Sequence, residues 1–384
     1  NTVHNNTENG IFLEQGYNNT IIGNTVHNNT LSGILLISSS NNNTIYDNSI
    51  ESNDNYGIEL QGSNYNHLKE NLIYNNTNHG IELMSSSNNN TIEANTVIDN
   101  GQGIDLSDSD GNVIVDNMVN GSLYAGIGVA NGDFTKIIGN IIYNNTQQGI
   151  YIDDIRNSII SENIVYNNTK EGIYIYLGNF TKVIGNIVYN NTRSGIYLES
   201  IYNSIISENI VCKNLLSGIY LTEENINNNL TRNIIRDNRN YGIDMLSSIT
   251  TDNLIWKNVF LRNGKHAMDG GSNNNWNITT IGNYWDNHTG PDTTPIDGIV
   301  DVPYDIGGIA GSADYLPIAE DGAPRITINS PSGGDAFSST APSFDVTITD
   351  DYLDLMWYSI DGGLNNYTFT ANGIIEQAAW DAIS

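Results

Sequence analysis

The sequence contains one cysteine, seven prolines and only 14 basic residues among 384. The lone Cys212 excludes an internal disulfide framework. No run of about 18 apolar residues occurs, so no segment is predicted to cross a membrane as a helix. Forty-three acidic residues give a net charge of −29. Nucleic-acid binding is therefore not expected, because it depends on Lys and Arg neutralising phosphates.

What the sequence does contain is an internal repeat. Residues 140–208 hold three copies of a 23-residue unit, NIIYNNTQQGIYIDDIRNSIISE, NIVYNNTKEGIYIYLGNFTKVIG and NIVYNNTRSGIYLESIYNSIISE. A fixed period of this size is typical of solenoids. Apolar and polar residues alternate around Ile196 and Leu198, and β-branched residues dominate, which favours strands over helices. Three short strands per unit predict a parallel β-helix.

The repeat aligns residues into columns that run from coil to coil. Three aliphatic columns are expected to fill a packed interior, and an asparagine column is expected to hydrogen-bond between coils. Gly-Ile pairs begin at Gly10, Gly33, Gly57, Gly80, Gly103, Gly126, Gly149, Gly172, Gly195, Gly218 and Gly242. The second column is Ile21, Ile45, Leu68, Ile92, Ile114, Ile137, Ile159, Val183, Ile205, Leu230 and Leu254. The third is Val26, Ile50, Ile73, Val97, Val119, Ile142, Val165, Val188, Val211 and Ile235. The asparagines are Asn24, Asn48, Asn71, Asn95, Asn117, Asn140, Asn163, Asn186, Asn209 and Asn233.

The predicted fold class is all-β. We expect a right-handed parallel β-helix of about 12 coils over residues 1–270 and an irregular C-terminal cap over 271–322. Short alternating strands over 323–384 predict the start of an immunoglobulin-like β-sandwich, with Trp357 in its core. The chain begins in mid-repeat, so we expect it to be part of a longer protein. The expected plugs of the cap are Tyr284, Trp285, Tyr304 and Tyr315.

The repeat N-x-[IV]-x-x-N-x-x-x-G-I-x-[IL] and the segment GNYWDNHTGPD…DGIVDVPYDI…ADYLPI resemble NosD-type and other secreted right-handed β-helix proteins. The resemblance covers roughly residues 1–320 and implies an extracellular protein of the archaeal cell-surface kind, often followed by Ig-like modules. The group's name also implies periplasmic copper delivery. The sequence has no cluster of Met, Cys or His residues, so copper is not among the expected cofactors.

Fifteen N-x-[ST] sequons occur, many as NNT, which favours a secreted glycoprotein. Asn144, Asn167 and Asn190 are expected to lie on successive coils about 4.8 Å apart, where neighbouring glycans would clash. Their amides could also face inward to the ladder. The expected glycosylation sites are the isolated sequons, at Asn229, Asn277, Asn287 and Asn366.

Two acidic sets are candidate metal sites, with Ca²⁺ as the expected cation because it prefers oxygen ligands. Glu59, Glu82 and Asp105 each follow a Gly-Ile pair and should stack on successive coils. A solvated acidic face is the alternative. The second set lies in PDTTPIDGIVD, where ordinary turn chemistry is the alternative, and comprises Asp292, Asp297 and Asp301.

The same column continues as a row of tyrosines that could bind glycans or a protein partner, although cross-strand packing alone would also explain it. These residues are Tyr151, Tyr174, Tyr197 and Tyr220.

The leading functional hypothesis is an extracellular structural or adhesin-like cell-surface rod. It would bind glycans or other surface subunits, or assemble into a homo-oligomer or filament. The alternative is a carbohydrate-active β-helix enzyme, a polysaccharide lyase or hydrolase, acting near the C-terminal coils. Its candidate catalytic residues are Arg236, Asp237, Arg262, His266 and Asp269.

Overall fold

The fold is described from a computed structural model of the chain. The structure describes residues 1–288, 290–293, 295–319, 325–331, 337, 339–349, 356–360, 365 and 367–382. The chain divides into two compact units, Asn1–Ala319 and Glu320–Ser384. Within the described residues, no helix has the length and apolar composition needed to cross a membrane.

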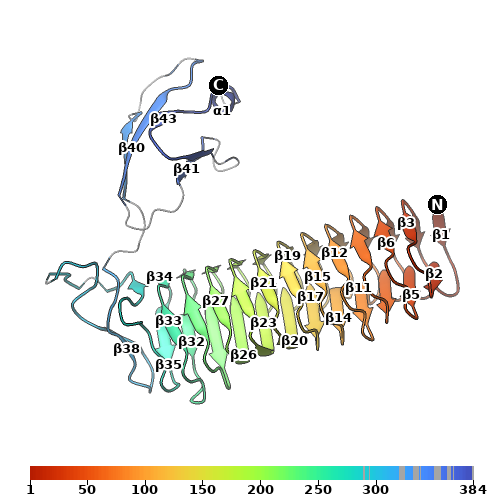
Figure 1. The fold of residues 1–384 in the computed structure, drawn as a ribbon, viewed down its shortest axis with the longest axis horizontal. Helices are drawn as coiled ribbons and strands as arrows, with labels where there is room; N and C mark the ends of the chain where they lie inside the picture. Colours follow the sequence, from red (N-terminus) through yellow and green to blue (C-terminus); the bar gives the residue numbers. More distant parts are fainter. Residues whose placement is uncertain are drawn as a thin grey trace. The chain divides into compact units, whose positions relative to one another are not determined.

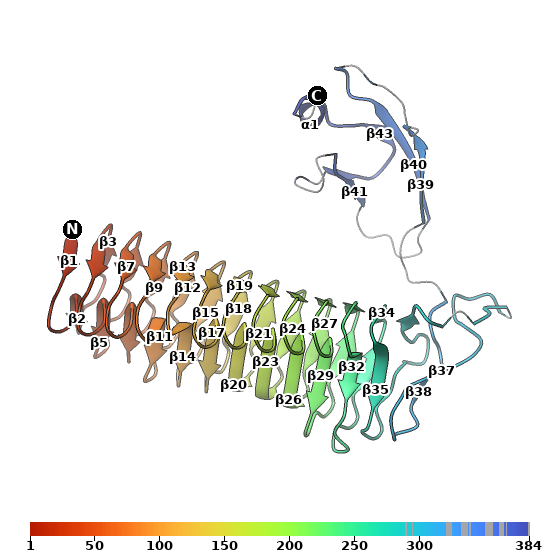
Figure 2. The same cartoon turned by 180° about the vertical axis from the view of Figure 1, so that it is seen from behind.

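The first unit is a β-solenoid in which each coil contributes one strand to each of three parallel sheets, called A, B and C (Figures 1 and 2). Along the chain a coil passes from sheet B to sheet C and then to sheet A.

The strands of sheet A are β1 (Thr2–His4), β4 (Thr25–His27), β7 (Ser49–Glu51), β10 (Leu72–Tyr74), β13 (Thr96–Ile98), β16 (Met118–Asn120), β19 (Ile141–Tyr143), β22 (Ile164–Tyr166), β25 (Ile187–Tyr189), β28 (Ile210–Cys212), β31 (Ile234–Arg236), β34 (Val259–Leu261) and β36 (Tyr284–Trp285). Those of sheet B are β2 (Ile11–Glu14), β5 (Ile34–Ile37), β8 (Ile58–Gln61), β11 (His79–Met84), β14 (Gln102–Ser107), β17 (Ile127–Ala130), β20 (Ile150–Arg156), β23 (Ile173–Asn179), β26 (Ile196–Tyr202), β29 (Ile219–Thr222), β32 (Tyr241–Met245) and β35 (Lys265–Asp269). Those of sheet C are β3 (Thr20–Ile22), β6 (Thr44–Tyr46), β9 (His67–Lys69), β12 (Thr91–Glu93), β15 (Val113–Val115), β18 (Lys136–Ile138), β21 (Ile159–Ser161), β24 (Lys182–Ile184), β27 (Ile205–Ser207), β30 (Asn229–Thr231) and β33 (Leu254–Trp256).

The interior is filled by stacked aliphatic side chains, as the columns predict. The Gly-Ile column and the third column are confirmed, but the second column is wrong in three coils. Ile160, Ile206 and Ile255 are buried there, whereas Ile205 faces outward and is 36% exposed. The sequence offers two adjacent apolar residues in each of these strands. The buried one lies three residues before the ladder asparagine, as Ile160 does before Asn163.

Ladders of polar side chains join the coils, and three of them consist mainly of buried asparagines. The predicted asparagine column is confirmed, because Asn140 donates to Asn163 Oδ1 at 3.0 Å through both its backbone N–H and its side-chain amide. Asn163 also donates to the carbonyl of Ile137 at 2.8 Å. Two further ladders, which were not predicted, lie at the corners that come after the strands of sheet A and of sheet B. In the first, the amide of Asn145 donates to Asn168, and in the second the amide of Asn228 donates to Asn253. Each rung satisfies backbone groups that a tight corner would otherwise leave buried and unpaired.

The last coils are closed by aromatic residues. Trp285 is buried and stacks on Phe260, with ring centroids 4.2 Å apart, and on Tyr304 at 4.1 Å. Its indole N–H donates to Asp314 at 3.0 Å. Tyr315, the fourth predicted plug, is instead 64% exposed. Within the cap, β37 (Tyr304–Asp305) and β38 (Ala313–Asp314) form a two-stranded antiparallel sheet.

The second unit contains two small antiparallel sheets among its described residues. The first joins β39 (Arg325–Ser330), β40 (Ser343–Thr349) and β43 (Gly373–Ile374), and the second joins β41 (Met356–Tyr358) and β42 (Tyr367–Phe369). A short helix, α1 (Gln377–Asp381), follows. These strands do not establish an immunoglobulin-like sandwich. The prediction for Trp357 is wrong, because its side chain is 53% exposed and does not form a buried core.

The ladders lead to a first prediction. Asn163→Ala should lower the free energy of unfolding by about 2–4 kcal/mol, because it removes a rung and leaves buried donors and acceptors unpaired. Urea unfolding followed by circular dichroism measures the effect. The matched control, Asn240→Ala, removes an exposed asparagine outside the ladders and should change little. Equal effects for the two variants would contradict the role given to the ladder.

Candidate functional site

The outer face of sheet B carries one column of side chains whose chemistry changes along the solenoid. Parallel pairing sets these residues directly above one another, one per coil. Between the apolar residues Leu35 and Met268, the column runs from carboxylates through a glycine and a row of tyrosines to an aspartate. In order it is Glu59, Glu82, Asp105, Gly128, Tyr151, Tyr174, Tyr197, Tyr220 and Asp244.

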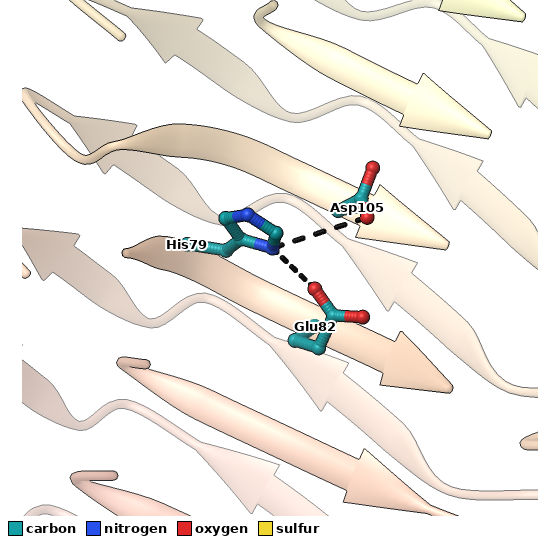
Figure 3. Close-up of side chains that lie close together, drawn as sticks. All are labelled: His79, Glu82 and Asp105. Carbon is teal, nitrogen blue, oxygen red and sulfur yellow. Dashed lines mark hydrogen bonds and ion pairs between the residues drawn. The ribbon is translucent and has the colours of Figure 1, made fainter. Parts of the chain in front are cut away.

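The acidic end contains a cluster of three potential ligands, His79, Glu82 and Asp105 (Figure 3). His79 and Glu82 belong to β11, and Asp105 belongs to the adjacent strand β14. One ring nitrogen of His79, Nδ1, contacts Glu82 Oε2 and lies 3.9 Å from Asp105 Oδ2. The side chains are 25%, 3% and 21% exposed, respectively. The cluster is therefore reachable from solvent mainly past the imidazole and Asp105.

Polar neighbours hold the carboxylates in place. Glu59 accepts hydrogen bonds from Ser32 Oγ and from Gln61 Nε2, both at 2.5 Å. The amide of Gln102 donates to Asp105. Glu59 and Glu82 are buried, at 5% and 2% exposure, so the alternative of a solvated acidic face is wrong for these two residues.

Gly128 follows the carboxylates in the column, and its lack of a side chain preserves the cluster. A Cβ added there would lie 2.0 Å from Gln102 Nε2 and 2.4 Å from Asp105 Oδ1. Any larger residue would displace the amide that orients Asp105. The same gap separates the acidic end of the column from Tyr151.

Burial makes the cluster hold protons. It raises the pKa of Glu82 to about 7, and the nearby charge of Asp105 adds to this. Burial also raises the pKa of Asp105. For His79 burial acts in the opposite direction, but the hydrogen bond and charge of Glu82 outweigh it and leave the pKa raised. The site can therefore either share protons near neutral pH or replace them with a cation.

The tyrosines form the middle of the column and are half-buried. Neighbouring rings of Tyr151, Tyr174, Tyr197 and Tyr220 have centroids 4.7–5.4 Å apart and are tilted by 61–75°. Sheet A carries a second ladder in which Tyr166 stacks almost parallel to its neighbours, at 4°. In a parallel stack each ring covers the face of the next, whereas tilted rings leave part of their faces open.

Carboxylates lie among the sheet B tyrosines. Tyr174 donates its hydroxyl to Glu199 at 2.5 Å. The pKa of Tyr197 is raised by burial and by the charge of Glu199. Asp244 accepts from Ser217 Oγ at 3.2 Å, and its other oxygen is buried without a partner among the described residues. Burial raises the pKa of Asp244. This face therefore offers hydrogen-bond acceptors beside aromatic surface.

The candidate catalytic residues of the C-terminal coils divide into two groups. Asp237 accepts from Arg236 at 2.8 Å and from Arg262 at 2.7 and 3.0 Å, which lowers the pKa of Asp237. His266 contacts Asp286 at 2.7 Å.

Asp269 lies apart from these, buried at the end of strand β35. It accepts hydrogen bonds from Gly271, Asn274, Trp276 and Ser312 at 2.7–3.1 Å. Four donors on a fully buried carboxylate describe a structural anchor of the last coil.

The aspartates of the cap loop accept from their own backbone. Asp292 receives the N–H groups of residues 297 and 298 at 3.2 and 2.9 Å, and Asp301 receives that of Thr293 at 3.0 Å. Asp297 receives that of Ile299 at 3.1 Å. Within the described ranges, their carboxylates do not converge as the His79 cluster does.

The sequons at the coil corners differ from expectation in their orientation. Asn144, Asn167 and Asn190 have positive φ angles of 54–56° and are exposed, while the asparagine after each of them enters the ladder. The inward orientation suggested for these residues is therefore wrong.

The four isolated sequons differ from one another in whether the asparagine amide is hydrogen-bonded. The oxygen of Asn229 accepts from Trp256 at 2.9 Å, and that of Asn277 from the Tyr315 backbone at 3.2 Å. Asn287 is exposed, and Asn366 lies outside the described residues. Glycosylation of any of these asparagines stays a prediction.

Sequence reasoning missed His79 and Gln102. Both occupy the position before a Gly-Ile pair, directly beside the acidic column. His79 comes three residues before Glu82, and Gln102 comes three residues before Asp105 on the next coil. This repeated spacing could have revealed that each pair is in contact.

Two family models match the chain. "Right handed beta helix region" matches residues 1–142, and "Periplasmic copper-binding protein (NosD)" matches residues 124–290. Together with the observed solenoid they show the fold. The chain is a parallel β-helix protein, and its residues 124–290 resemble the NosD family. No curated protein sequence matches it significantly.

Solved structures of similar fold include two epimerases and a tailspike protein. The A-module of mannuronan C-5 epimerase AlgE4 from Azotobacter vinelandii aligns at 13% identity and a TM-score of 0.56, covering 71% of this chain and 80% of that one. A double mutant of the periplasmic alginate epimerase AlgG aligns at 16% and 0.53, covering 70% and 82%. The Dettilon tailspike protein aligns at 13% and 0.55, covering 66% of this chain and 61% of the tailspike. At these identities the likeness shows the fold alone.

The NosD description names copper, and the donor atoms of this chain decide which copper ion it could hold. Cu⁺ prefers sulfur ligands, and Cys212, buried between Tyr189 and Arg236 in its column, belongs to no cluster of three potential ligands among the described residues. One imidazole nitrogen and two carboxylate oxygens suit Cu²⁺ or Zn²⁺ better, so the His79 cluster fits by donor type. The same oxygens without the imidazole would suit Ca²⁺, and binding of any of these ions stays a prediction.

The raised pKa values predict how stability depends on pH. Because the folded state holds these protons more tightly than the unfolded chain, the unfolded chain ionises first as the pH rises. The free energy of unfolding should therefore fall from about pH 4.5 to about 7, by at most about 1.4 kcal/mol per pH unit for Glu82. His79 and Asp105 act in the same direction. Urea unfolding at a series of pH values checks this.

Two additions make the pH experiment specific. Glu82→Gln should flatten the slope, whereas Glu162→Gln, at an exposed corner, should not. At pH 7.5, Zn²⁺ or Cu²⁺ should raise the unfolding midpoint of the wild type but not of His79→Ala or Glu82→Gln if the cluster binds that ion. Ca²⁺, held by the carboxylates alone, should raise the midpoint of the wild type and of His79→Ala but not of Glu82→Gln if it binds there. If none of the three ions changes the unfolding midpoint, the cluster does not bind a cation, and shared protons alone would offset its charge.

Proposed function

We propose that the protein binds a linear carbohydrate along the outer face of sheet B. The observation that carries this proposal is the row of four half-buried tyrosines with tilted rings, in register on successive coils. Tyrosine combines apolar ring surface with a polar hydroxyl, which suits sugars with their C–H faces and hydroxyl edges.

Spacing supports an extended ligand lying along the solenoid. Neighbouring coils are about 4.8 Å apart, close to the length of one hexose unit in an extended chain. A polysaccharide parallel to the axis would thus meet the same kind of side chain at each sugar. The solved structures of similar fold, named as alginate epimerases and a tailspike, agree with a carbohydrate-related role.

We place this function outside the cytoplasm, in line with the periplasmic description of the family. A cell-surface location, N-glycosylation, an archaeal source and assembly into an oligomer or filament belong to the same proposal. The rod would present the binding face, and the many sequons of the exposed corners would lie on another edge of the coil.

The test compares two tyrosine ladders of the same molecule. Binding is measured first on an array of linear hexasaccharides, then by calorimetry with the best binder. Tyr174→Ala and Tyr197→Ala should each weaken binding about tenfold or more, because central aromatic residues dominate such contacts. Tyr166→Ala removes a similar ring from sheet A and should leave affinity unchanged. Equal losses for Tyr166→Ala, or no binding to any glycan, would refute the proposal.

A second candidate is a carbohydrate-active enzyme whose acid–base groups are His79, Glu82 and Asp105, favoured by the near-neutral pKa of Glu82 beside the binding face. This location differs from the C-terminal coils predicted by sequence. Incubating the protein with the glycans it binds and assaying for new reducing ends or unsaturated sugars tests it. Activity that survives Glu82→Gln would place catalysis elsewhere.

A further inference from the structure

The charges on the proposed glycan-binding face are almost all of one sign. From β8 to β32 the strands of sheet B contain seven acidic residues and two basic ones, Arg156 and His79. The carboxylates are Glu59, Glu82, Asp105, Asp153, Asp154, Glu199 and Asp244.

These charges lie close to the tyrosine rings. Asp153 raises the pKa of Tyr151, after burial, and Glu199 does the same for Tyr174 and Tyr197. Two cations precede strands of the ladder: Arg193 is paired with the buried Glu171 at 3.2 Å, and Lys170 donates to Gln147 at 3.0 Å. Among the described residues, Asp153 and Glu199 thus provide acceptors beside the rings, and these strands offer little positive charge to an anionic ligand.

We propose that this face selects a glycan whose sugars carry hydroxyl or amino groups and no carboxylates. The inference rests on the proposed carbohydrate binding and names its ligand class. Carboxylates accept hydrogen bonds from hydroxyls and more strongly from ammonium groups. Because the repeat of such a chain is close to that of the solenoid, a uronate in each sugar would meet like charge on alternate tyrosine coils, at Asp153 on β20 and at Glu199 on β26.

This ligand class differs from the substrates that the titles of similar structures name. Those proteins are called mannuronan or alginate epimerases, and both names denote acidic polysaccharides. The shared fold does not transfer that preference, because specificity depends on side chains that 13–16% identity leaves free to differ.

The experiment measures affinity for three hexasaccharides of equal length and β-1,4 linkage: a glucose hexamer, a glucosamine hexamer and a mannuronate hexamer. Calorimetry at pH 6 in low salt should show the glucosamine hexamer at least as tight as the glucose hexamer. The mannuronate hexamer should bind at least about tenfold more weakly than either. Added salt should reduce the differences among the three.

Charge-removing variants assign the effect to this face. Asp153→Asn combined with Glu199→Gln should bring the mannuronate hexamer to within a few-fold of the glucose hexamer, whereas Glu162→Gln at a distant corner should not. Mannuronate binding as tight as glucose in the wild type, with or without added divalent cation, would overturn the inference. Absence of binding to all three sugars would refute carbohydrate binding itself.

Discussion

The whole solenoid depends on parallel stacking of coil upon coil in a fixed register. Each strand pairs with the equivalent strand of the next coil, and side-chain amides repeat the pairing at the corners. A slip of one residue would exchange the buried and exposed faces of a strand and break three ladders at once. The register is therefore determined by both the aliphatic interior and the asparagines. Where two isoleucines are adjacent, as at Ile159 and Ile160, the aliphatic pattern alone does not decide which of them is buried.

Stacking also explains why chemistry accumulates on sheet B. A residue type repeated in the sequence becomes a continuous column about 4.8 Å per step, so a carboxylate becomes a row of carboxylates and a tyrosine becomes a ladder. Like charges in such a row are unfavourable. The chain relieves this with Ser32, Gln61 and Gln102, with the imidazole of His79, and with protons held by burial. The outcome is one face that is acidic at one end and aromatic in the middle.

The sequence predicted the coil length, two of the three aliphatic columns and one of the three ladders, because strict period and residue type are visible in it. It did not predict that Ile206 rather than Ile205 is buried, since two adjacent isoleucines satisfy the pattern equally. Burial of Glu59 and Glu82 was also missed, because it depends on how neighbours pack in three dimensions: Ser32 of the preceding coil against Glu59, and His79 of the same strand against Glu82. The tyrosine column was placed correctly, but only the ring tilts distinguish it from the parallel stack on sheet A.

The central claim is that one face, sheet B, binds an extended glycan in step with the coils. A crystal structure of the full chain with a bound hexasaccharide tests it most directly. The account predicts sugar rings over Tyr151, Tyr174, Tyr197 and Tyr220, with the glycan parallel to the solenoid axis and advancing one sugar per coil. A glycan seated on sheet A, on sheet C or on the second unit, with sheet B bare, would contradict it.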